Sequence, residues 1–460
     1  MRKNMLIYSI TNEEDLKAIP NWAQWLELRF DLDANLIDHL SQLDSYKVII
    51  TDRWDKEGGK SRRSVEKKLH LYQSLANYDN LYFDIEIALI EANPDLDLDY
   101  RRMILSYHNF EALDIPVIKN KLQLACSLQP FMVKVAQYCS SLGQVRMLHQ
   151  VIKEQSREIL WLVIGDYANL QRLLFPYLCS IGTFIANSGS QTIEGQLTQE
   201  SVEKYQHLLA TKLYKWGGLI GGEQVYKSLG LDYYNHHFQE KKIEACYLPI
   251  NLKESDLKEF FALIKNNQEL KENCYGFSLT MPFKKSIPQL FNHKKISNLI
   301  IYGMNHKFYN TDYDAFLKLK ENIRDLGIKR ILIYGTGSMA ELALEVFVEG
   351  QISLAGRNLD RLQELKLKRK NIEIIDQISP ELYFDLLINT SSLGMKGESF
   401  SQETGISNFK YVIDLPYSQV EIPLQLEVEE ENYFSGRDFW SDQSERQLQL
   451  FKERIENDKK

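Results

Sequence analysis

The sequence of 460 residues lacks the features that mark several classes of protein. It has only five cysteines and no C-x-x-C pair, which argues against a disulfide framework or a zinc site. No stretch reaches the ~18 uninterrupted apolar residues of a membrane helix, and acidic residues follow the first apolar run too soon for a signal peptide. The formal net charge of −8 leaves no excess of basic residues for nucleic acid. We therefore expect a cytoplasmic protein that binds small molecules and needs no metal. The sequence leaves the oligomeric state open and is compatible with a monomer.

The composition is that of a globular protein, with 44% hydrophobic and 26% charged residues. At roughly 150 residues per domain, the length predicts two or three domains. Eight short apolar runs with helical spacers occur in the first 200 residues or so, at Met5–Ile10, Trp25–Leu32, Lys47–Arg53, Leu81–Ile87, Met103–Phe110, Met132–Gln137, Ile159–Gly165 and Ile181–Asn187. Strands that alternate with helices pair in parallel, and eight such units predict an α/β fold with an N-terminal (β/α)8 TIM barrel.

Polar side chains fall near the ends of these runs, where such barrels do their chemistry. They include Glu27, Arg29, Arg53, Glu86, His108, Lys134, Arg172 and Gln196. Taken alone, Lys134 could be a buried ion-pair partner and His108 a core histidine. Their convergence on one rim favours a site instead. A lysine among apolar neighbours has a lowered pKa and can form a Schiff base with a ketone, while a histidine on the next strand moves protons.

These residues stand in motifs that resemble type I 3-dehydroquinate dehydratase. The motifs are Glu-Leu-Arg-Phe-Asp at 27–31, Thr-Asp-Arg with Glu-Gly-Gly at 51–59, Asp-Ile-Glu at 84–86, Ser-Tyr-His-Asn-Phe at 106–110 and Val-Lys-Val-Ala at 133–136. The resemblance implies that Lys134 forms the Schiff base and that His108 is the acid/base group, oriented by Glu86. It also implies substrate contacts from Glu27, Arg29, Arg53, Arg172, Thr192 and Gln196. In the lid loop, Glu194 departs from the family pattern and would add a negative charge near a pocket for a carboxylate.

The second half contains a nucleotide-binding pattern. A strand at 330–334 is followed by Gly335-Thr-Gly337-Ser338-Met-Ala340 and then by an apolar helix. In this context the glycines let backbone N–H groups meet a pyrophosphate at a helix N-terminus. The next strand ends in Arg357 rather than an acid, which favours the 2′-phosphate of NADP, although Arg357 could also be a solvated loop charge.

Further motifs in this half resemble shikimate dehydrogenase. They are Thr280-x-Pro-x-Lys284, Asn-Thr-Asp at 310–312, Asn-Thr-Ser-Ser-Leu-Gly-Met at 389–395, and Gly436 with Gln443 seven residues on. The resemblance implies proton transfer by Lys284 and Asp312. It implies substrate contacts from Ser228, Thr280, Asn305, Tyr417 and Gln443, and NADP contacts from Gly335, Gly337, Ser338, Ala340, Arg357, Asn389 and Gly436.

Both resemblances together imply consecutive reactions of the shikimate pathway, in which 3-dehydroquinate is dehydrated to 3-dehydroshikimate and this product is reduced with NADPH. We expect a barrel at 1–208, a substrate domain at 214–314, a Rossmann NADP-binding domain at 315–435 and a C-terminal helix at 436–460. Gly230 stands where a second carboxylate-binding serine is expected. The loss of that hydroxyl leaves two alternatives open: an active dehydratase with a diverged or inactive reductase, or a sensor or scaffold that retains both folds.

Overall fold

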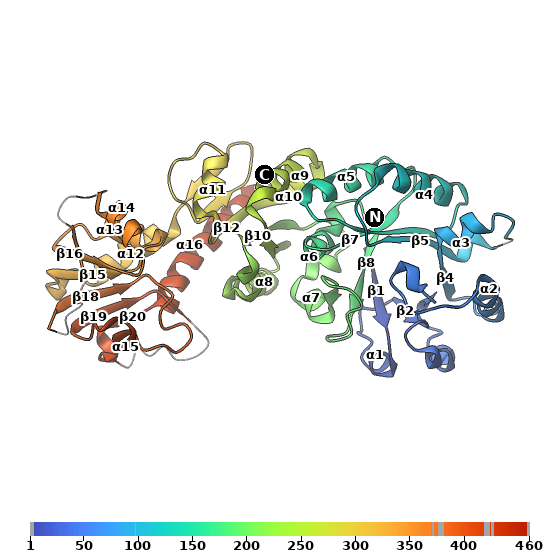
Figure 1. Cartoon of the computed structure of the whole chain (residues 1–460), viewed down its shortest axis with the longest axis horizontal. Helices are drawn as coiled ribbons and strands as arrows, with labels where there is room; N and C mark the ends of the chain where they lie inside the picture. The colour runs from blue at the N-terminus through green and yellow to red at the C-terminus, as the bar shows by residue number, and fades with distance from the viewer. Residues whose placement is uncertain are drawn as a thin grey trace. The chain divides into compact units, whose positions relative to one another are not determined.

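The computed structural model describes residues 4–96, 98–367, 369, 372–375, 381–417, 424 and 427–457. The outermost residues of the first and last predicted segments, 1–3 and 458–460, lie outside this set. The chain forms two compact units, one made of Met1–Phe277 with Met281–Phe283 and the other of Ser278–Thr280 with Lys284–Lys460. Figure 1 follows the chain from blue at the N-terminus to red at the C-terminus. Among the described residues, no helix combines the length and the apolar character needed to cross a membrane.

The first unit begins with a TIM-like parallel sheet, as the sequence predicted. Its main strands are β1 (Met5–Ile10), β2 (Trp25–Arg29), β3 (Lys47–Thr51), β4 (Leu81–Glu86), β5 (Met103–Asn109), β6 (Met132–Tyr138), β7 (Ile159–Ile164) and β8 (Gly182–Ala186). They are ordered β7-β6-β5-β4-β3-β2-β1-β8, followed by the short β9 (Leu197–Thr198). An isolated parallel bridge between Ile159 and Ser180 connects the two ends of the eight-strand order.

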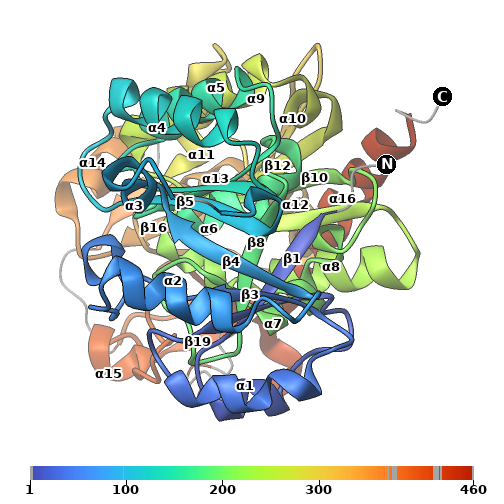
Figure 2. The same ribbon diagram turned by 90° about the vertical axis from the view of Figure 1, so that its right-hand side faces the viewer.

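Short helices follow most of these strands, which is how eight units fit into about 200 residues. They are α1 (Glu13–Lys17), α2 (Val65–Ser74), α3 (Ile87–Ala92), α4 (Ile115–Ser127), α5 (Leu142–Lys153), α6 (Ala168–Leu173) and α7 (Gln199–Lys204). Figure 2 shows α2, α3 and α4 outside strands β4 and β5. Helix α4 illustrates the local rules: the Asp114 side chain caps its N-terminus, and Ile118, Leu122 and Ala125 form its buried stripe.

The barrel interior is apolar below its carboxyl-terminal rim. Ile7, Ile49, Ile104, Leu160 and Phe184 belong to one buried cluster. Because alternate residues of a strand point to one face, the polar residues that follow these apolar ones in the same strands reach the rim. The fold therefore places the predicted polar side chains at one end of the barrel.

The first unit continues beyond the barrel into a second sheet. Here β10 (Lys215–Gly221) pairs in parallel with β11 (Ala245–Asn251), and β12 (Cys274–Leu279) lies on the other side of β10. Helices α8 (Leu229–Glu240), α9 (Leu257–Asn266) and α10 (Gln268–Asn273) connect these strands. Since 1–277 form one compact unit, this lobe and the barrel pack together.

The second unit contains α11 (Phe283–Leu290), the antiparallel pair β13 (Leu299–Ile301) and β14 (Lys307–Tyr309), and α12 (Thr311–Asn322). After them comes a parallel sheet ordered β17 (Ile372–Ile374), β16 (Gln351–Ala355), β15 (Arg330–Tyr334), β18 (Phe384–Asn389), β19 (Phe409–Asp414), β20 (Tyr433–Ser435). Helices α13 (Ser338–Val346), α14 (Leu359–Leu367), α15 (Phe400–Thr404) and α16 (Gly436–Asn457) accompany it. The order corresponds to 3-2-1-4-5-6, which confirms the predicted Rossmann fold and puts a switch point between β15 and β18.

Candidate active sites

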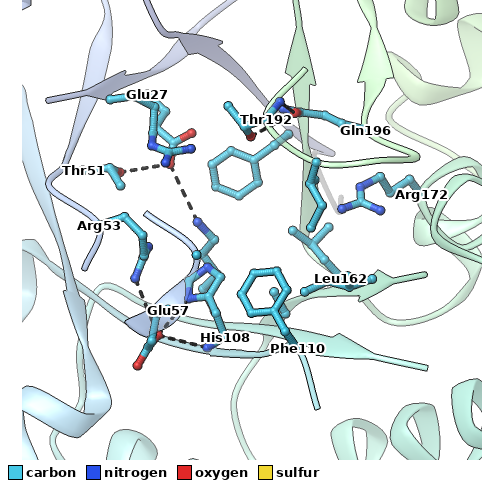
Figure 3. Close-up of a pocket in the computed structure, with 17 residues that line it drawn as sticks. Glu27, Thr51, Arg53, Glu57, His108, Phe110, Leu162, Arg172, Thr192 and Gln196 are labelled. Atoms are coloured by element: carbon cyan, nitrogen blue, oxygen red, sulfur yellow. Dashed lines mark hydrogen bonds and ion pairs between the residues drawn. The ribbon is translucent and has the colours of Figure 1, made fainter. Parts of the chain in front are cut away.

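A cavity of about 120 Å³ lies at the rim of the barrel (Figure 3). Its lining includes most of the residues predicted for this half, namely Glu27, Arg29, Arg53, His108, Lys134, Arg172, Thr192 and Gln196. It also includes residues that the sequence reasoning did not assign, among them Thr51, Glu57, Phe110, Phe184 and Ile193. Glu194 is exposed and is absent from this lining, although its neighbour Ile193 belongs to it, so its carboxylate lies near the cavity without forming part of its wall.

Lys134 projects from β6 into this cavity and is 5% exposed. Its Nζ lies 3.3 Å from Asp84 Oδ2, 3.7 Å from Glu27 Oε1 and 4.1 Å from the centre of the Phe184 ring. Lys134 is therefore a buried ion-pair partner, the alternative that the sequence left open, and it faces the cavity as well. The amine is screened from solvent, but two carboxylates hold it in a fixed place at the cavity wall.

His108 lies on β5, the strand next to that of Lys134; in the register between the two, Ser106 stands opposite Lys134. The Nδ1 atom of His108 is 3.1 Å from Glu57 Oε2, which also accepts the main-chain N–H of His108 at 3.1 Å. Burial, and then the positive charges of Arg53 and Lys134, hold the pKa of His108 well below its usual range. Burial raises the pKa of Glu57 to about 7. The imidazole is therefore neutral at neutral pH and can accept a proton.

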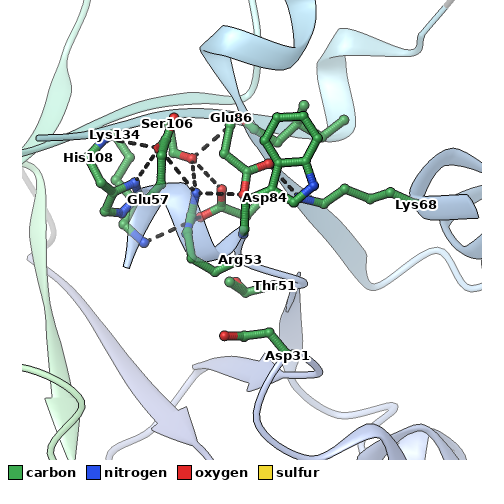
Figure 4. A network of polar contacts seen from close by, with 12 residues as sticks. Asp31, Thr51, Arg53, Glu57, Lys68, Asp84, Glu86, Ser106, His108 and Lys134 are labelled. Atoms are coloured by element: carbon green, nitrogen blue, oxygen red, sulfur yellow. Dashed lines mark hydrogen bonds and ion pairs between the residues drawn. The ribbon is translucent and has the colours of Figure 1, made fainter. Parts of the chain in front are cut away.

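Glu86 does not orient His108, which corrects the sequence prediction (Figure 4). Glu86 is fully buried, with Oε2 2.5 Å from Lys68 Nζ and Oε1 accepting the main-chain N–H of Trp54 at 3.0 Å. It is the last residue of β4 and turns toward α2, outside the cavity lining. The carboxylate that reaches the imidazole comes instead from the loop after β3, four residues beyond Arg53.

Arg53 and Asp84 form a buried ion pair next to Lys134. The Arg53 Nη2 atom is 2.6 Å from Asp84 Oδ2, and Arg53 Nη1 donates to Ser106 Oγ at 2.7 Å. Burial alone would raise the pKa of Asp84, but Arg53 and then Lys134 hold it below its usual range. Asp84 therefore stays ionised between these two cations and fixes both.

Arg172 is a buried cation on α6 that faces the cavity from the opposite side to His108 (Figure 3). Its Nη1 donates to the Val163 carbonyl at 2.8 Å, whereas its Nε is buried without a hydrogen bond in the described structure. Burial lowers its pKa to about 10. A desolvated guanidinium that keeps a free donor at a cavity wall is suited to binding a ligand carboxylate.

The lid loop, residues 192–196, forms another wall of the cavity. Gln196 Oε1 accepts the main-chain N–H and the hydroxyl of Thr192 at 2.9 and 3.2 Å. Gln196 Nε2 is 3.5 Å from Ser9 Oγ, which donates to Glu27 at 2.9 Å. These contacts connect the loop to strands β1 and β2 and leave polar groups available at the rim.

The second unit holds a separate polar centre. Lys284 Nζ lies 2.5 Å from Asp312 Oδ2, so the two predicted proton-transfer residues are brought together. Burial, and then the charge of Asp312, raise the pKa of the Tyr417 hydroxyl. Thr280 is partly buried at the end of β12.

A buried network of amides and hydroxyls belongs to the same unit. Asn298 Nδ2 donates to Thr311 Oγ1 at 3.0 Å and to Gln443 Oε1 at 3.2 Å. Gln447 donates to the same two oxygens and accepts a 2.5 Å hydrogen bond from Ser278. The network fixes Gln443 and connects α12 to α16. Asn298 and Gln447 were missed from the sequence because neither stands in a recognised motif.

Two predicted substrate contacts are placed differently from expectation. Asn305 is exposed in the turn between β13 and β14, so the prediction that it binds substrate is not supported, and the buried Asn298 occupies the polar network instead. Ser228 belongs to the first unit, where its Oγ accepts the Gly230 N–H at 3.2 Å and caps α8. A Cβ at Gly230 would lie 3.3 Å from the Tyr234 ring, which leaves little room for a second serine.

The loop between β15 and α13 has the shape of a nucleotide-binding turn. Gly335 has φ +130°, and a Cβ there would lie 2.3 Å from Thr390 Oγ1, so only glycine fits. Nothing lies within 4 Å of a Cβ built on Gly337, at the N-terminus of α13. Ser338 begins that helix and Ala340 is buried against the sheet. The turn therefore leaves space and free backbone donors for a pyrophosphate.

Arg357 is exposed after β16, where a 2′-phosphate would be recognised. Arg361, which the sequence reasoning missed, reaches the same turn: its Nη2 pairs with Glu341 at 3.0 Å and its Nε lies 3.4 Å from the Thr336 carbonyl. These residues fit a dinucleotide with an additional phosphate.

Asn389 and Gly436 shape the cofactor region rather than offer side chains to it. Asn389 is fully buried; its amide donates to Asp414 at 2.8 Å and accepts the hydroxyl of Ser391 at 2.7 Å. The Asn389 side chain is therefore occupied by contacts within the protein, and its contact with NADP stays a prediction. A Cβ at Gly436 would lie 2.3 Å from the Leu415 carbonyl, so glycine allows α16 to begin close to the loop after β19.

Comparison with known proteins identifies two families along the chain. Residues 9–212 match the family "Type I 3-dehydroquinase", and residues 220–301 match "Shikimate dehydrogenase substrate binding domain". Shikimate dehydrogenase (NADP(+)) from Dictyoglomus turgidum is 30% identical over 253 residues, 50% of this chain and 87% of the relative. The enzyme of the same name from Pelagibacter ubique is 30% identical over 217 residues, 44% and 80% of the two chains.

Two solved structures are similar as well. Dehydroquinate dehydratase and shikimate dehydrogenase from S. pombe AroM aligns with 100% of this chain and 99% of its own, at 16% identity and a TM-score of 0.39. Shikimate dehydrogenase from Aquifex aeolicus aligns with 53% of this chain and 97% of its own, at 24% identity and a TM-score of 0.44.

Proposed function

This chain belongs to the shikimate dehydrogenase family and carries a type I 3-dehydroquinase domain, and we propose that its two sites catalyse consecutive reactions with the residues described above. It is a multifunctional shikimate-pathway enzyme, both a 3-dehydroquinate dehydratase and an NADP-dependent shikimate dehydrogenase. Its substrates are accordingly 3-dehydroquinate and 3-dehydroshikimate. We assign the dehydratase to 1–208, the substrate domain to 214–314, the NADP-binding domain to 315–435 and the last helix to 436–460. A cytoplasmic location stays a prediction.

In the barrel, Lys134 condenses with the C3 ketone of 3-dehydroquinate and releases water. The resulting iminium ion acidifies C2, from which the neutral His108 takes a proton. His108 then returns this proton to the departing C1 hydroxyl, which leaves as water, and hydrolysis of the Schiff base frees the product and the lysine. Glu57 keeps the imidazole in place through its contact with Nδ1.

The remaining cavity residues bind the substrate. We assign the substrate carboxylate to the Arg172 guanidinium, whose Nε has no hydrogen-bond partner in the described part of the chain. Around the space for the ring hydroxyls lie Glu27, Arg29, Arg53, Thr192 and Gln196. One observation carries the proposal: a buried amine and a neutral imidazole on neighbouring strands face one cavity, which the buried guanidinium of Arg172 also lines.

In the reductase, NADPH supplies a hydride to the C3 carbonyl of 3-dehydroshikimate when it is bound. We assign delivery of the proton to the carbonyl oxygen to Lys284 and Asp312, because the two groups lie 2.5 Å apart and can share that proton. Thr280, Tyr417 and Gln443 are the proposed substrate contacts. The turn at Gly335, Gly337 and Ser338 would hold the pyrophosphate, and Arg357 the 2′-phosphate.

Two spectrophotometric assays on the full chain test the proposal. One follows formation of the conjugated enone from 3-dehydroquinate, and the other follows oxidation of NADPH with 3-dehydroshikimate. Turnover in both is expected. Turnover in the first alone would overturn the assignment of the second site, and turnover in neither would overturn the proposal and support a sensor or scaffold.

A further inference from the structure

Arg172, the proposed carboxylate-binding residue, is carried by a weakly supported element. Helix α6 has only six residues, and its N-cap residue Tyr167 makes no capping hydrogen bond with its side chain. A single turn and a half of helix is not stable by itself, so its position must come from tertiary contacts. The position of the guanidinium therefore depends on the tertiary contacts that hold α6, among them those at its two ends.

The N-terminal end of α6 is held by a residue from the lobe that follows the barrel. Tyr167 Oη donates a 2.6 Å hydrogen bond to Asp256 Oδ2, and both side chains are buried. The other oxygen of Asp256 accepts the main-chain N–H of Leu142, the first residue of α5, at 3.1 Å. The Asp256 carboxylate of the lobe therefore connects the start of α5 with the residue just before α6, and its bond to Tyr167 is charge-assisted.

The neighbouring contacts between the lobe and the barrel differ from the Asp256–Tyr167 hydrogen bond in their exposure to solvent. Lys253 pairs with Asp166 at 2.5 Å, and Arg146 pairs with Glu259 at 2.8 Å. All four side chains are at least one-third exposed, and exposed ion pairs contribute little to stability. At the other end of α6, a ring nitrogen of the buried His207 lies 2.8 Å from the Leu173 carbonyl. The buried side-chain contacts of α6 thus include Asp256 at its start, His207 at its end and, between them, Gln171, which hydrogen-bonds the main chain of Trp161 and Val163 on β7.

Helix α6 also supports the lid loop. A Cβ at Gly195 would lie 2.7 Å from Ala168 Cβ and 3.0 Å from Asn169 N, so the loop packs directly on the first turn of α6. Gln196, the next residue, lines the cavity with Arg172. A shift at the start of α6 would therefore move two walls of the cavity, whereas Lys134 and His108 on β6 and β5 would keep their places.

We propose that Asp256, a residue of the reductase half, is a positioning residue for the dehydratase, which holds Arg172 in place through Tyr167 and α6. The inference rests on the proposed function. It means that the dehydratase site is completed by the lobe downstream of the barrel, so that substrate affinity in the first reaction depends on a side chain outside the dehydratase domain.

The test measures the dehydratase kinetics of Asp256→Ala, Tyr167→Phe and the double variant in the full chain. Each single change is expected to raise the KM for 3-dehydroquinate about tenfold with kcat changed less than about threefold, because binding rather than proton transfer is disturbed. The double variant is expected to be no worse than the worse single variant, because both remove the same bond. Asp256→Asn, which retains an acceptor oxygen, should recover part of the loss.

Glu259→Gln is the matched control, since it breaks an exposed pair on the same lobe without touching α6. It should leave the KM unchanged, and Tyr167→Phe should leave the KM of the reductase for 3-dehydroshikimate unchanged. Unaltered KM values in both folded single variants, additive losses in the double variant, or an equal loss in the control would each overturn the inference. An inactive wild-type dehydratase would instead overturn the proposed function.

Discussion

The carboxylate of Glu57 lies 3.1 Å from Nδ1 of His108, in a site where burial raises the pKa of Glu57 to about 7 and depresses that of His108. The imidazole is neutral over the physiological range, so the group that ionises near neutrality is the carboxyl. When Glu57 is ionised, it accepts a hydrogen bond from Nδ1–H of His108 and leaves Nε2 as the basic nitrogen. The protonation state of Glu57 thus controls the basicity of its neighbour.

This relationship predicts the pH dependence of the dehydratase. The value of kcat/KM is expected to rise with pH through about 7, as Glu57 loses its proton. In Glu57→Gln this rise should disappear and kcat should fall by about 10²-fold. The exposed Glu194 provides the matched control: Glu194→Gln should retain the rise. A rise of the same midpoint in Glu57→Gln would show that another group is responsible.

A second prediction concerns the stability of the barrel. Lys68 and Glu86 form a fully buried ion pair, and Lys68→Met would leave a buried carboxylate without its main partner. This change should lower the free energy of unfolding by about 3–5 kcal/mol. The double variant with Glu86→Gln should recover much of the loss, because the amide still accepts the Trp54 N–H without a charge. Calorimetric unfolding of both variants checks this.

The exposed pair of Lys119 and Glu154 serves as the reference for that experiment. Lys119→Met should change the unfolding free energy by less than about 0.5 kcal/mol. An equal loss of unfolding free energy in Lys68→Met and in the double variant would mean that lost packing, rather than the unpaired charge, causes the destabilisation.

The reductase should depend on Lys284 and Asp312 as a pair. Asp312→Asn and Lys284→Met are each expected to lower kcat for NADPH oxidation by about 10²-fold, and the double variant should not be much worse, since the two act through one contact. Dehydratase activity of the same samples should be unchanged, which confirms that they are folded. Wild-type reductase turnover in either variant would contradict the assigned roles.

The preference for NADPH over NADH should depend on Arg357. Replacing it with alanine is expected to raise the KM for NADPH about tenfold, because a charged contact with the 2′-phosphate is lost. The KM for NADH, which lacks that phosphate, should hardly change and acts as the internal control. An equal change for both cofactors would indicate that Arg357 shapes the loop instead.

Most of the architecture could be predicted from the sequence because its strands are strongly patterned. The run at Met5–Ile10 is a strand with the same bounds, and the prediction at Lys47–Arg53 differs from β3 only at its end. Period-two patterning and the βα alternation determine these elements locally. The clustering of Lys134, His108 and Arg53 followed from the rule that barrel chemistry lies at the carboxyl ends of strands.

The pairing of individual side chains could not be predicted in the same way. Glu57 follows β3 and Glu86 ends β4, and only the path of the loop after β3 decides which one reaches His108. Likewise, Asn298 and Asn305 are seven residues apart, but one is buried beside Gln443 and the other is exposed in a turn. Such choices depend on tertiary contacts that no local pattern encodes.

The account as a whole depends on the amine of Lys134 acting as the nucleophile. The most direct measurement is borohydride reduction of the full chain in the presence of 3-dehydroquinate, followed by peptide mass mapping. We predict a single reduced substrate adduct on Lys134, which is absent in Lys134→Met and still formed in Lys68→Met. An adduct on another lysine, or wild-type dehydration without any trapped adduct, would contradict the account.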